Sequence, residues 1–261
     1  MIDPRLRGRV AVITGADSPL GIGAATARAL ARQGCKVVLV SRPRTPPEPT
    51  DHVCDALRAD GVEADSVAVD LADPSAAGVV FEHAEGCFGP VEILVNNAAH
   101  HVPDTFRADP VRGLVAVEAA GLDAHHAVNT RAPALLIAEF HRRHLRRRAS
   151  WGRIISISTD AVPGTAGEVS HLASKHALES LSRSAAAELG SAGTTVNIIA
   201  CGPVQTGWLS EHATARAAEL SPLGRVGRPD DIADLVVFLA SHQARWLTGQ
   251  TLYAGGGKRM L

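Results

Sequence analysis

Short apolar runs alternate with helix-like stretches along most of this chain, and no other feature restricts its fold as strongly. The runs resemble buried parallel strands, which are apolar throughout because helices cover both faces of their sheet. They lie at residues 10–14, 36–40, 66–69, 93–96, 153–158 and 195–200. A last run at residues 250–253 follows a helix-like stretch at residues 230–240. This order predicts an α/β fold with one parallel sheet.

A length of 261 residues is sufficient for one domain, which we expect to span residues 1–261. The expected architecture is a Rossmann-type doubly wound parallel sheet with helices on both faces. Residues 205–228 interrupt the alternation, because an Ala-rich stretch is surrounded there by Gly207, Pro222 and Gly224. We predict a lid-like insertion at this place rather than a second domain.

A turn rich in small residues, TGADSPLGIG at residues 14–23, joins the first predicted strand to a helix-like stretch. Its small residues let the backbone approach a pyrophosphate, whose charge is favoured at the positive end of the next helix. The position between strand and helix strengthens the motif. A tight turn without a ligand is the alternative. A second motif, Asn-Asn-Ala-Ala at residues 96–99, follows the fourth strand.

Polar residues with a defined spacing occur in the second half of the chain. His171 and Lys175 are one helical turn apart and would face the same side of a helix, while Ser158 ends the fifth predicted strand. Together with Asn129 and the two motifs above, these residues resemble the short-chain dehydrogenase/reductase family. The resemblance extends over about residues 7–257.

The resemblance implies a dinucleotide cofactor. Its NAD-specific members carry an acid at the end of the second strand, where this chain has Ser41 and Arg42. Since a guanidinium pairs with a 2′-phosphate, we expect NADP(H). Asp70 would contact the adenine, and a helix cap is an equally good explanation of that residue. The expected cofactor-binding residues are Gly15, Gly21, Ile22, Gly23, Ser41, Arg42, Asp70, Asn97, Lys175, Gly202 and Thr206. The gap between Gly15 and Gly21 is longer than usual and is similar to that of a subset of ketone reductases.

His171 stands where this family has its catalytic tyrosine. The resemblance assigns the substrate oxygen to Ser158, an ordered water on the proton path to Asn129, and support of the acid to Lys175. Imidazole has an ordinary pKa of about 6.5 against about 10 for a phenol. Lys175 would lower the pKa further, so we expect a neutral His171 that needs a bridging water or a deeper substrate. Alternatively, the residue at this position has lost the role of a catalytic acid.

Function follows from these assignments. We expect NADPH-dependent reduction of a carbonyl or related polarised double bond on a small metabolite, with an atypical relay through His171. A non-redox lyase, isomerase, cyclase or dehydratase is one alternative, and an inactive nucleotide-binding protein is another. The presence of Ser158, Asn129 and Lys175 together argues against the inactive protein. His100 or His101 could supply the acid from the opposite wall.

Composition limits the partners and the location. Lys and Arg total 26 against 27 Asp and Glu, so we expect no nucleic acid and no membrane surface as partner. The four cysteines lack metal-site spacing, and we predict no metal. No signal-peptide pattern opens the sequence and no apolar run approaches about 20 residues, so a cytoplasmic location is expected. Apolar faces at residues 123–144 and 170–190, with the family resemblance, predict a homo-oligomer, a tetramer or a dimer.

Overall fold

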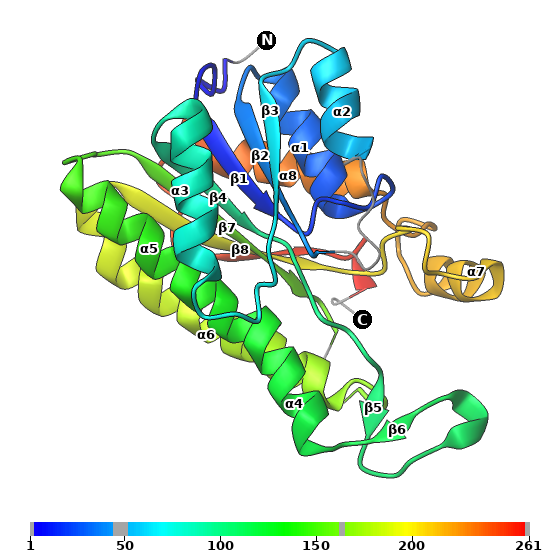
Figure 1. Ribbon diagram of the computed structural model, residues 1–261. Coiled ribbons are helices and arrows are strands. Elements are labelled where there is room, and N and C mark those ends of the chain that lie inside the picture. The colour runs from blue at the N-terminus through cyan, green and yellow to red at the C-terminus, as the bar shows by residue number, and fades with distance from the viewer. Residues whose placement is uncertain (1–2, 44–51, 162–164, 259–261) are drawn as a thin grey trace.

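The computed structural model describes residues 3–43, 52–161 and 165–258. All seven strands of the main sheet run parallel, in the order β3-β2-β1-β4-β7-β8-β9. The order reverses its direction of growth between β1 and β4, which places the binding crevice of such sheets at the carboxyl ends of these two strands. Figure 1 shows helices in front of and behind the sheet. The doubly wound α/β fold is therefore confirmed.

The element bounds follow the predicted alternation closely. The strands of the main sheet are β1 (Val10–Thr14), β2 (Lys36–Ser41), β3 (Ala64–Ala68), β4 (Val91–Asn96), β7 (Gly152–Thr159), β8 (Thr194–Cys201) and β9 (Thr251–Ala254). The helices are α1 (Ile22–Arg32), α2 (His52–Ala59), α3 (Ala76–Phe88), α4 (Ala119–His126), α5 (Ala132–Arg146), α6 (Val169–Leu189), α7 (Glu211–Glu219) and α8 (Pro229–Ala240). A π-helical turn, Ala127–Arg131, joins α4 to α5.

Two apolar layers hold the sheet between the helices. One layer contains Leu30 of α1, Val53 of α2 and Val236 of α8, and the other contains Phe81 of α3 and Phe140 of α5. All five side chains are buried. At about 25 cal/mol per Å² of apolar surface, burying one such side chain contributes roughly 1.5 to 3 kcal/mol. Both faces are therefore covered, which explains why the central strands are apolar throughout.

Strand β3 is the element where the pattern was least accurate. It begins at Ala64, whereas the apolar run predicted a start at Ser66. Because β3 is an edge strand, Asp65 can lie in a regular strand while its side chain stays partly exposed. The paired backbone, rather than the side-chain pattern, therefore defines this strand.

Two excursions extend from the carboxyl end of the sheet. Residues 102–118 leave after β4 and include the short strands β5 (Asp104–Thr105) and β6 (Val115–Ala116), an excursion that the sequence did not predict. Residues 205–226 carry α7, which projects from the body in Figure 1. The second excursion is closed at its base by backbone hydrogen bonds between Gln205 and Gly227 and between Gly227 and Pro203. Its ends therefore lie together, and its role as a lid stays a prediction.

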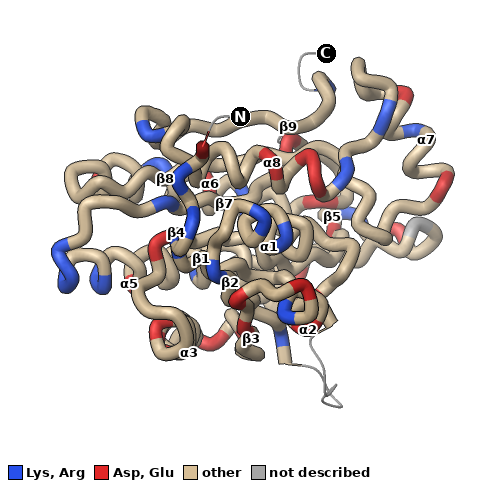
Figure 2. The backbone as a smooth tube through the Cα atoms, turned by 90° about the horizontal axis from the view of Figure 1, so that it is seen from above, with Lys and Arg blue, Asp and Glu red and all other residues tan. Residues whose placement is uncertain are grey.

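Lys, Arg, Asp and Glu are spread along the backbone in Figure 2, and Lys and Arg positions gather at the end of α5. Two of these cations, Arg142 and Arg143, pair with Glu139. No helix among the described residues is long and apolar enough to span a membrane. Cys35, Cys54, Cys87 and Cys201 all lie in described segments, and no disulfide joins them.

Candidate active site

The glycine-rich turn is tied to the end of β4. The Asn97 side chain donates to the carbonyls of Thr14 and Gly15 at 2.8 and 2.9 Å, and the Thr14 hydroxyl accepts from the amides of Asn97 and Ala98 at 3.0 Å each. The side-chain amide of Asn97 holds the turn against β4, and its predicted contact with a cofactor stays a prediction. The two motifs recognised separately in the sequence therefore form one rigid unit.

Two positions in this turn, Gly15 and Gly23, have no room for a side chain, and Gly21 has little. Gly15 has φ +67°, and a Cβ there would lie 2.7 Å from the Cα of Ala98. A Cβ on Gly23 would lie 2.4 Å from the Gly15 carbonyl oxygen, and one on Gly21 would lie 3.1 Å from the Ser18 carbonyl oxygen. Gly21 precedes Ile22, the first residue of α1, so the backbone can approach an anion at the positive end of this helix.

A cavity of about 330 Å³ opens beside the turn. It is lined by Gly15, Ser41, Arg42, Asp70 and His100, among others. Arg42 has no carboxylate partner among the described residues. Asp70 is exposed at the rim, where its carboxylate accepts from the amide of Ala72 at 2.9 Å. Because α3 starts only at Ala76, Asp70 stabilises a turn and does not cap that helix.

The first turn of α6 carries His171 and is fixed by a buried acid. Asp104, which is 3% exposed, accepts from the amide of Ser170 at 2.9 Å and from its hydroxyl. This contact caps α6 from the excursion after β4, since the first amides of a helix lack partners within it. Lys175 follows one turn later and donates to the carbonyl of Ile157 on β7 at 2.9 Å.

Burial shifts the pKa values of both His171 and Lys175. The pKa of His171 is lowered to about 4, first by burial and then by Lys175 and His101. The pKa of Lys175 is lowered to about 8, also by burial. His171 is therefore neutral near pH 7 while Lys175 keeps its charge. From the sequence we expected Lys175 to lower the pKa of His171, and burial lowers that pKa more than Lys175 does. The Nδ1 atom of His171 is buried and lacks a hydrogen-bond partner among the described residues.

Three further histidines surround His171. The ring of His101 lies 4.7 Å from that of His171 between centroids, and the ring of His125 lies 6.3 Å away. His101 contacts Glu168 at 2.8 Å, and this hydrogen bond raises its pKa. His125 is buried between the Gly121 carbonyl and the Val102 amide, which fixes its tautomer. His100 lines the cavity, and burial lowers its pKa.

Ser158 does not point toward His171 in this structure. Its hydroxyl, on a residue that is 4% exposed, donates to the carboxylate of Glu179 on α6 at 2.8 Å. Thr159 follows it on β7 and is only partly buried. Because successive strand side chains point to opposite faces, the Thr159 hydroxyl lies on the other side of β7. This difference could not be found from spacing, which places both residues near His171.

Asn129 lies in the π-helical turn, and both the oxygen and the nitrogen of its side-chain amide make hydrogen bonds. It accepts from the amide of His100 at 2.7 Å and donates to the carbonyl of His100 and to the Ser174 hydroxyl, both at 2.9 Å. Asn129 therefore ties the His100 loop to α6. Its predicted ordered water remains a prediction.

The remaining predicted residues lie at the base of the lid-like insertion. The amide of Gly202 donates to the Ala254 carbonyl at 3.1 Å, and a Cβ on Gly202 would lie 2.6 Å from the Cα of Gly255. Thr206 is partly buried at the start of the insertion. The close approach of two backbones explains the glycine at position 202.

Comparisons with known proteins agree with this geometry. A family model described as enoyl-(acyl carrier protein) reductase matches residues 15–259. An uncharacterized oxidoreductase, YjdA of Bacillus subtilis, is 35% identical over 95% of this chain and 96% of its own length. The chain belongs to the short-chain dehydrogenase/reductase family. It is thus similar to oxidoreductases, and the family is one of nicotinamide-dependent enzymes.

Other relatives and solved structures extend the likeness over the whole chain. Versicolorin reductase stcU of Emericella nidulans is 34% identical over 97% of this chain and 96% of its own length. A short-chain dehydrogenase/reductase from Serratia marcescens has a TM-score of 0.84 at 30% identity, covering 97% of this chain and 99% of that one. A blue fluorescent protein from a metagenomic library, solved in complex with NADPH, has a TM-score of 0.84 at 31% identity, covering 97% and 98%.

Proposed function

We propose that this protein is an NADPH-dependent oxidoreductase that reduces a carbonyl, or a related polarised double bond, on a small metabolite. One observation carries the cofactor preference: Arg42 lines the cavity beside the glycine-rich turn and has no carboxylate partner among the described residues. A free guanidinium favours a 2′-phosphate, which an acid at this place would repel. The NADPH complex of a similar structure supports the same preference.

The residues fit a bound dinucleotide. The backbone at Gly15, Gly21, Ile22 and Gly23 would receive the pyrophosphate, because added Cβ atoms at the three glycines would approach the neighbouring atoms too closely. Ser41, Arg42 and Asp70 would hold the adenosine end, and Lys175, Gly202 and Thr206 the nicotinamide end. The bound nicotinamide would supply the hydride.

The protein's own residues would manage the negative charge on the substrate oxygen. A neutral His171 can donate one N–H hydrogen bond to the substrate oxygen. The ammonium of Lys175, also on α6, would stabilise the negative charge that develops on that oxygen. Since His171 is almost never protonated near pH 7, the transferred proton must come from another group. His101 fits, because its contact with Glu168 raises its pKa and its exposure lets solvent return the proton.

Apolar side chains are exposed on both excursions. Phe106 and Val111 are 84% and 96% exposed on residues 102–118, and Trp208 and Leu223 are 90% and 70% exposed on residues 205–226. Exposed apolar groups that gather beside a site are typical of a binding surface. We therefore infer a substrate with a substantial apolar part, with the two excursions as its walls.

Cofactor choice is tested by calorimetry with NADPH and NADH. Removing a charge-assisted contact costs about 1.5 to 3 kcal/mol, so Arg42→Ala should weaken NADPH binding roughly 10- to 150-fold and leave NADH binding nearly unchanged. Arg32→Ala, at the exposed end of α1, is the matched control and should have no effect. Equal affinity for the two cofactors in the unaltered protein would overturn the preference.

The relay is tested by the loss of NADPH absorbance when ketones and aldehydes are offered. Turnover should fall as the pH rises through the pKa of His101, and His101→Gln should remove this limb. His171→Phe removes one hydrogen-bond donor to the substrate oxygen and should lower turnover on the order of 10²-fold with little change in NADPH affinity. Full activity in both variants would exclude this relay and show that another group is the acid. No loss of NADPH absorbance in the unaltered protein with any of these substrates would favour the non-redox alternative.

The role of Ser158 is tested by the Ser158→Ala variant. If the Ser158 hydroxyl keeps its bond to Glu179, this variant should lower turnover only slightly. A loss on the order of 10²-fold would show that Ser158 contacts the substrate oxygen, as the family resemblance implies.

A further inference from the structure

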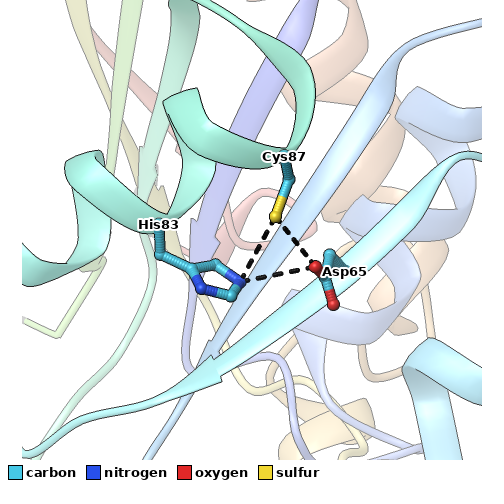
Figure 3. Close-up of side chains that lie close together, drawn as sticks. All are labelled: Asp65, His83 and Cys87. Atoms are coloured by element: carbon cyan, nitrogen blue, oxygen red, sulfur yellow. Dashed lines mark hydrogen bonds and ion pairs between the residues drawn. The ribbon is translucent and has the colours of Figure 1, made fainter.

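Three side chains with different ligand atoms meet at the outer edge of the sheet, on β3 and α3. Figure 3 shows the Asp65 carboxylate, the His83 ring and the Cys87 thiol directed toward one another. The Cys87 Sγ lies 2.9 Å from Asp65 Oδ2 and 3.8 Å from His83 Nε2. The His83 Nε2 lies 3.5 Å from the same Asp65 Oδ2. One oxygen, one nitrogen and one sulfur atom thus converge.

The periodicities of the two elements produce this meeting. His83 and Cys87 are four residues apart on α3, so they lie on the same side of the helix. Asp65 and Val67 share one face of β3, and Val67 packs in the apolar layer that contains Phe81 of α3. The strand therefore presents Asp65 to α3 by the same alternation that buries Val67.

Two of the three distances are near those of a coordination polyhedron. Zinc bonds of about 2.0 to 2.3 Å in a tetrahedral site separate oxygen, nitrogen and sulfur ligands by about 3.3 to 3.6 Å. The observed nitrogen–oxygen and nitrogen–sulfur distances of 3.5 and 3.8 Å are each slightly longer than the corresponding values. The sulfur–oxygen distance of 2.9 Å is shorter because the thiol now donates a hydrogen bond to the carboxylate. A metal would replace this proton and separate the two atoms slightly.

The charges around the group also suit a divalent cation. Arg58 of α2 pairs with the other carboxylate oxygen, Asp65 Oδ1, and leaves Oδ2 facing His83 and Cys87. Such an outer contact orients a ligating carboxylate. The carboxylate and an ionised thiol together neutralise two positive charges, and the thiol proton would pass to the buffer on binding.

A nucleophilic site is a poorer explanation of the same residues. In a Cys-His-Asp relay the imidazole uses one nitrogen for the thiol and the other for the acid. Here the same Nε2 atom of His83 faces both Cys87 and Asp65. The hydrogen bond from Cys87 to Asp65 also raises the pKa of the thiol, which disfavours a reactive thiolate.

We propose that Asp65, His83 and Cys87 form a binding site for a zinc-like divalent transition metal, with water completing the coordination shell. The metal would join the last turns of α3 to the edge strand β3. Asp65 and Asp70 are five residues apart on extended chain, so the proposed site is roughly 15 Å from the cavity end of β3. The inference is therefore independent of the proposed oxidoreductase function.

Cobalt(II) titration of the whole protein tests this site, because a cobalt–thiolate bond gives a charge-transfer absorption in the near ultraviolet. Cys87 is the exposed cysteine, whereas Cys35, Cys54 and Cys201 are buried. The group of His101, Glu168 and His171, whose ligand atoms also lie within 4.8 Å of one another, contains no sulfur and cannot give this band. The band should saturate at one equivalent and disappear when zinc is added.

Variants distinguish a metal site formed by all three residues from metal binding by the Cys87 thiol alone. Cys87→Ser should abolish the band, and His83→Ala and Asp65→Asn should each weaken cobalt binding at least 10-fold. His126→Ala, an exposed histidine of α4, is the control and should bind as the unaltered protein does. Zinc should also raise the unfolding temperature of the unaltered protein but not of Cys87→Ser. NADPH affinity should be unchanged in all of these variants.

Two results would overturn the proposal. One is the absence of the cobalt–thiolate band at millimolar cobalt. The other is a band of unchanged affinity in both His83→Ala and Asp65→Asn, which would show that Cys87 binds the metal alone.

Discussion

Lowering the pH from 7 to 5 should cost the unaltered protein about 2 kcal/mol more stability than it costs the His171→Phe variant. Burial, Lys175 and His101 lower the pKa of His171 to about 4 in the folded protein. An unfolded histidine keeps a pKa of about 6.5. Between these two values the unfolded chain binds a proton that the folded protein excludes. The stability is fully present above about pH 6.5 and is lost as the pH falls toward 4.

The magnitude follows from these two pKa values. At pH 5 an unfolded histidine of pKa about 6.5 is almost fully protonated, while the folded one is about one tenth protonated, which gives about 2 kcal/mol. His101 acts with the opposite sign, because its raised pKa favours the folded state in acid. It is present in both proteins, so the comparison with His171→Phe largely removes its contribution.

Urea denaturation at pH 7 and pH 5 measures this difference, and the pH-independent cost of the substitution cancels. The control is His212→Phe, at an exposed position on α7, which should keep the pH dependence of the unaltered protein. If the unaltered protein and His171→Phe lost equal stability, within about 0.5 kcal/mol, folded His171 would titrate as an unfolded histidine does. The argument from burial would then be wrong.

Three other predictions concern the turn, the lysine and the assembly. Gly15→Ala should lower the free energy of unfolding by on the order of 2 kcal/mol, because φ is positive and a Cβ would contact Ala98. Gly78→Ala, in open space on α3, should instead raise it by up to about 1 kcal/mol, and urea denaturation measures both. Lys175→Ala should weaken NADPH binding in calorimetry, whereas unchanged affinity would remove it from the cofactor site. Light scattering should show a tetramer or a dimer, and a monomer at micromolar concentration would contradict the predicted assembly.

The architecture was determined by the sequence alone. Buried parallel strands must be apolar, so six strands and the edge strand appear in the sequence as short runs between helices. The glycine-rich turn after the run at residues 10–14 was also predicted, and it lies at the carboxyl end of β1 beside a cavity. The spacing of His171 to Lys175 was also visible, because it depends only on the helical period. That His171 occupies the place of a catalytic tyrosine stays a prediction.

The directions of side chains were decided by the tertiary structure. Spacing predicts that the Ser158 hydroxyl contacts the substrate, and only the structure shows that this hydroxyl donates to Glu179 of α6. The sequence could not choose a proton donor for a similar reason. The contact that raises the pKa of His101 joins it to Glu168, which lies in a separate segment of the chain.

Asp65 shows the same limit most clearly. His83 and Cys87 have a visible spacing on one helix, while Asp65 belongs to a strand that the apolar pattern placed one residue too late to include it. Periodicity describes how one element faces its core. Contacts between two elements depend on the packing of the whole sheet, which no local pattern records.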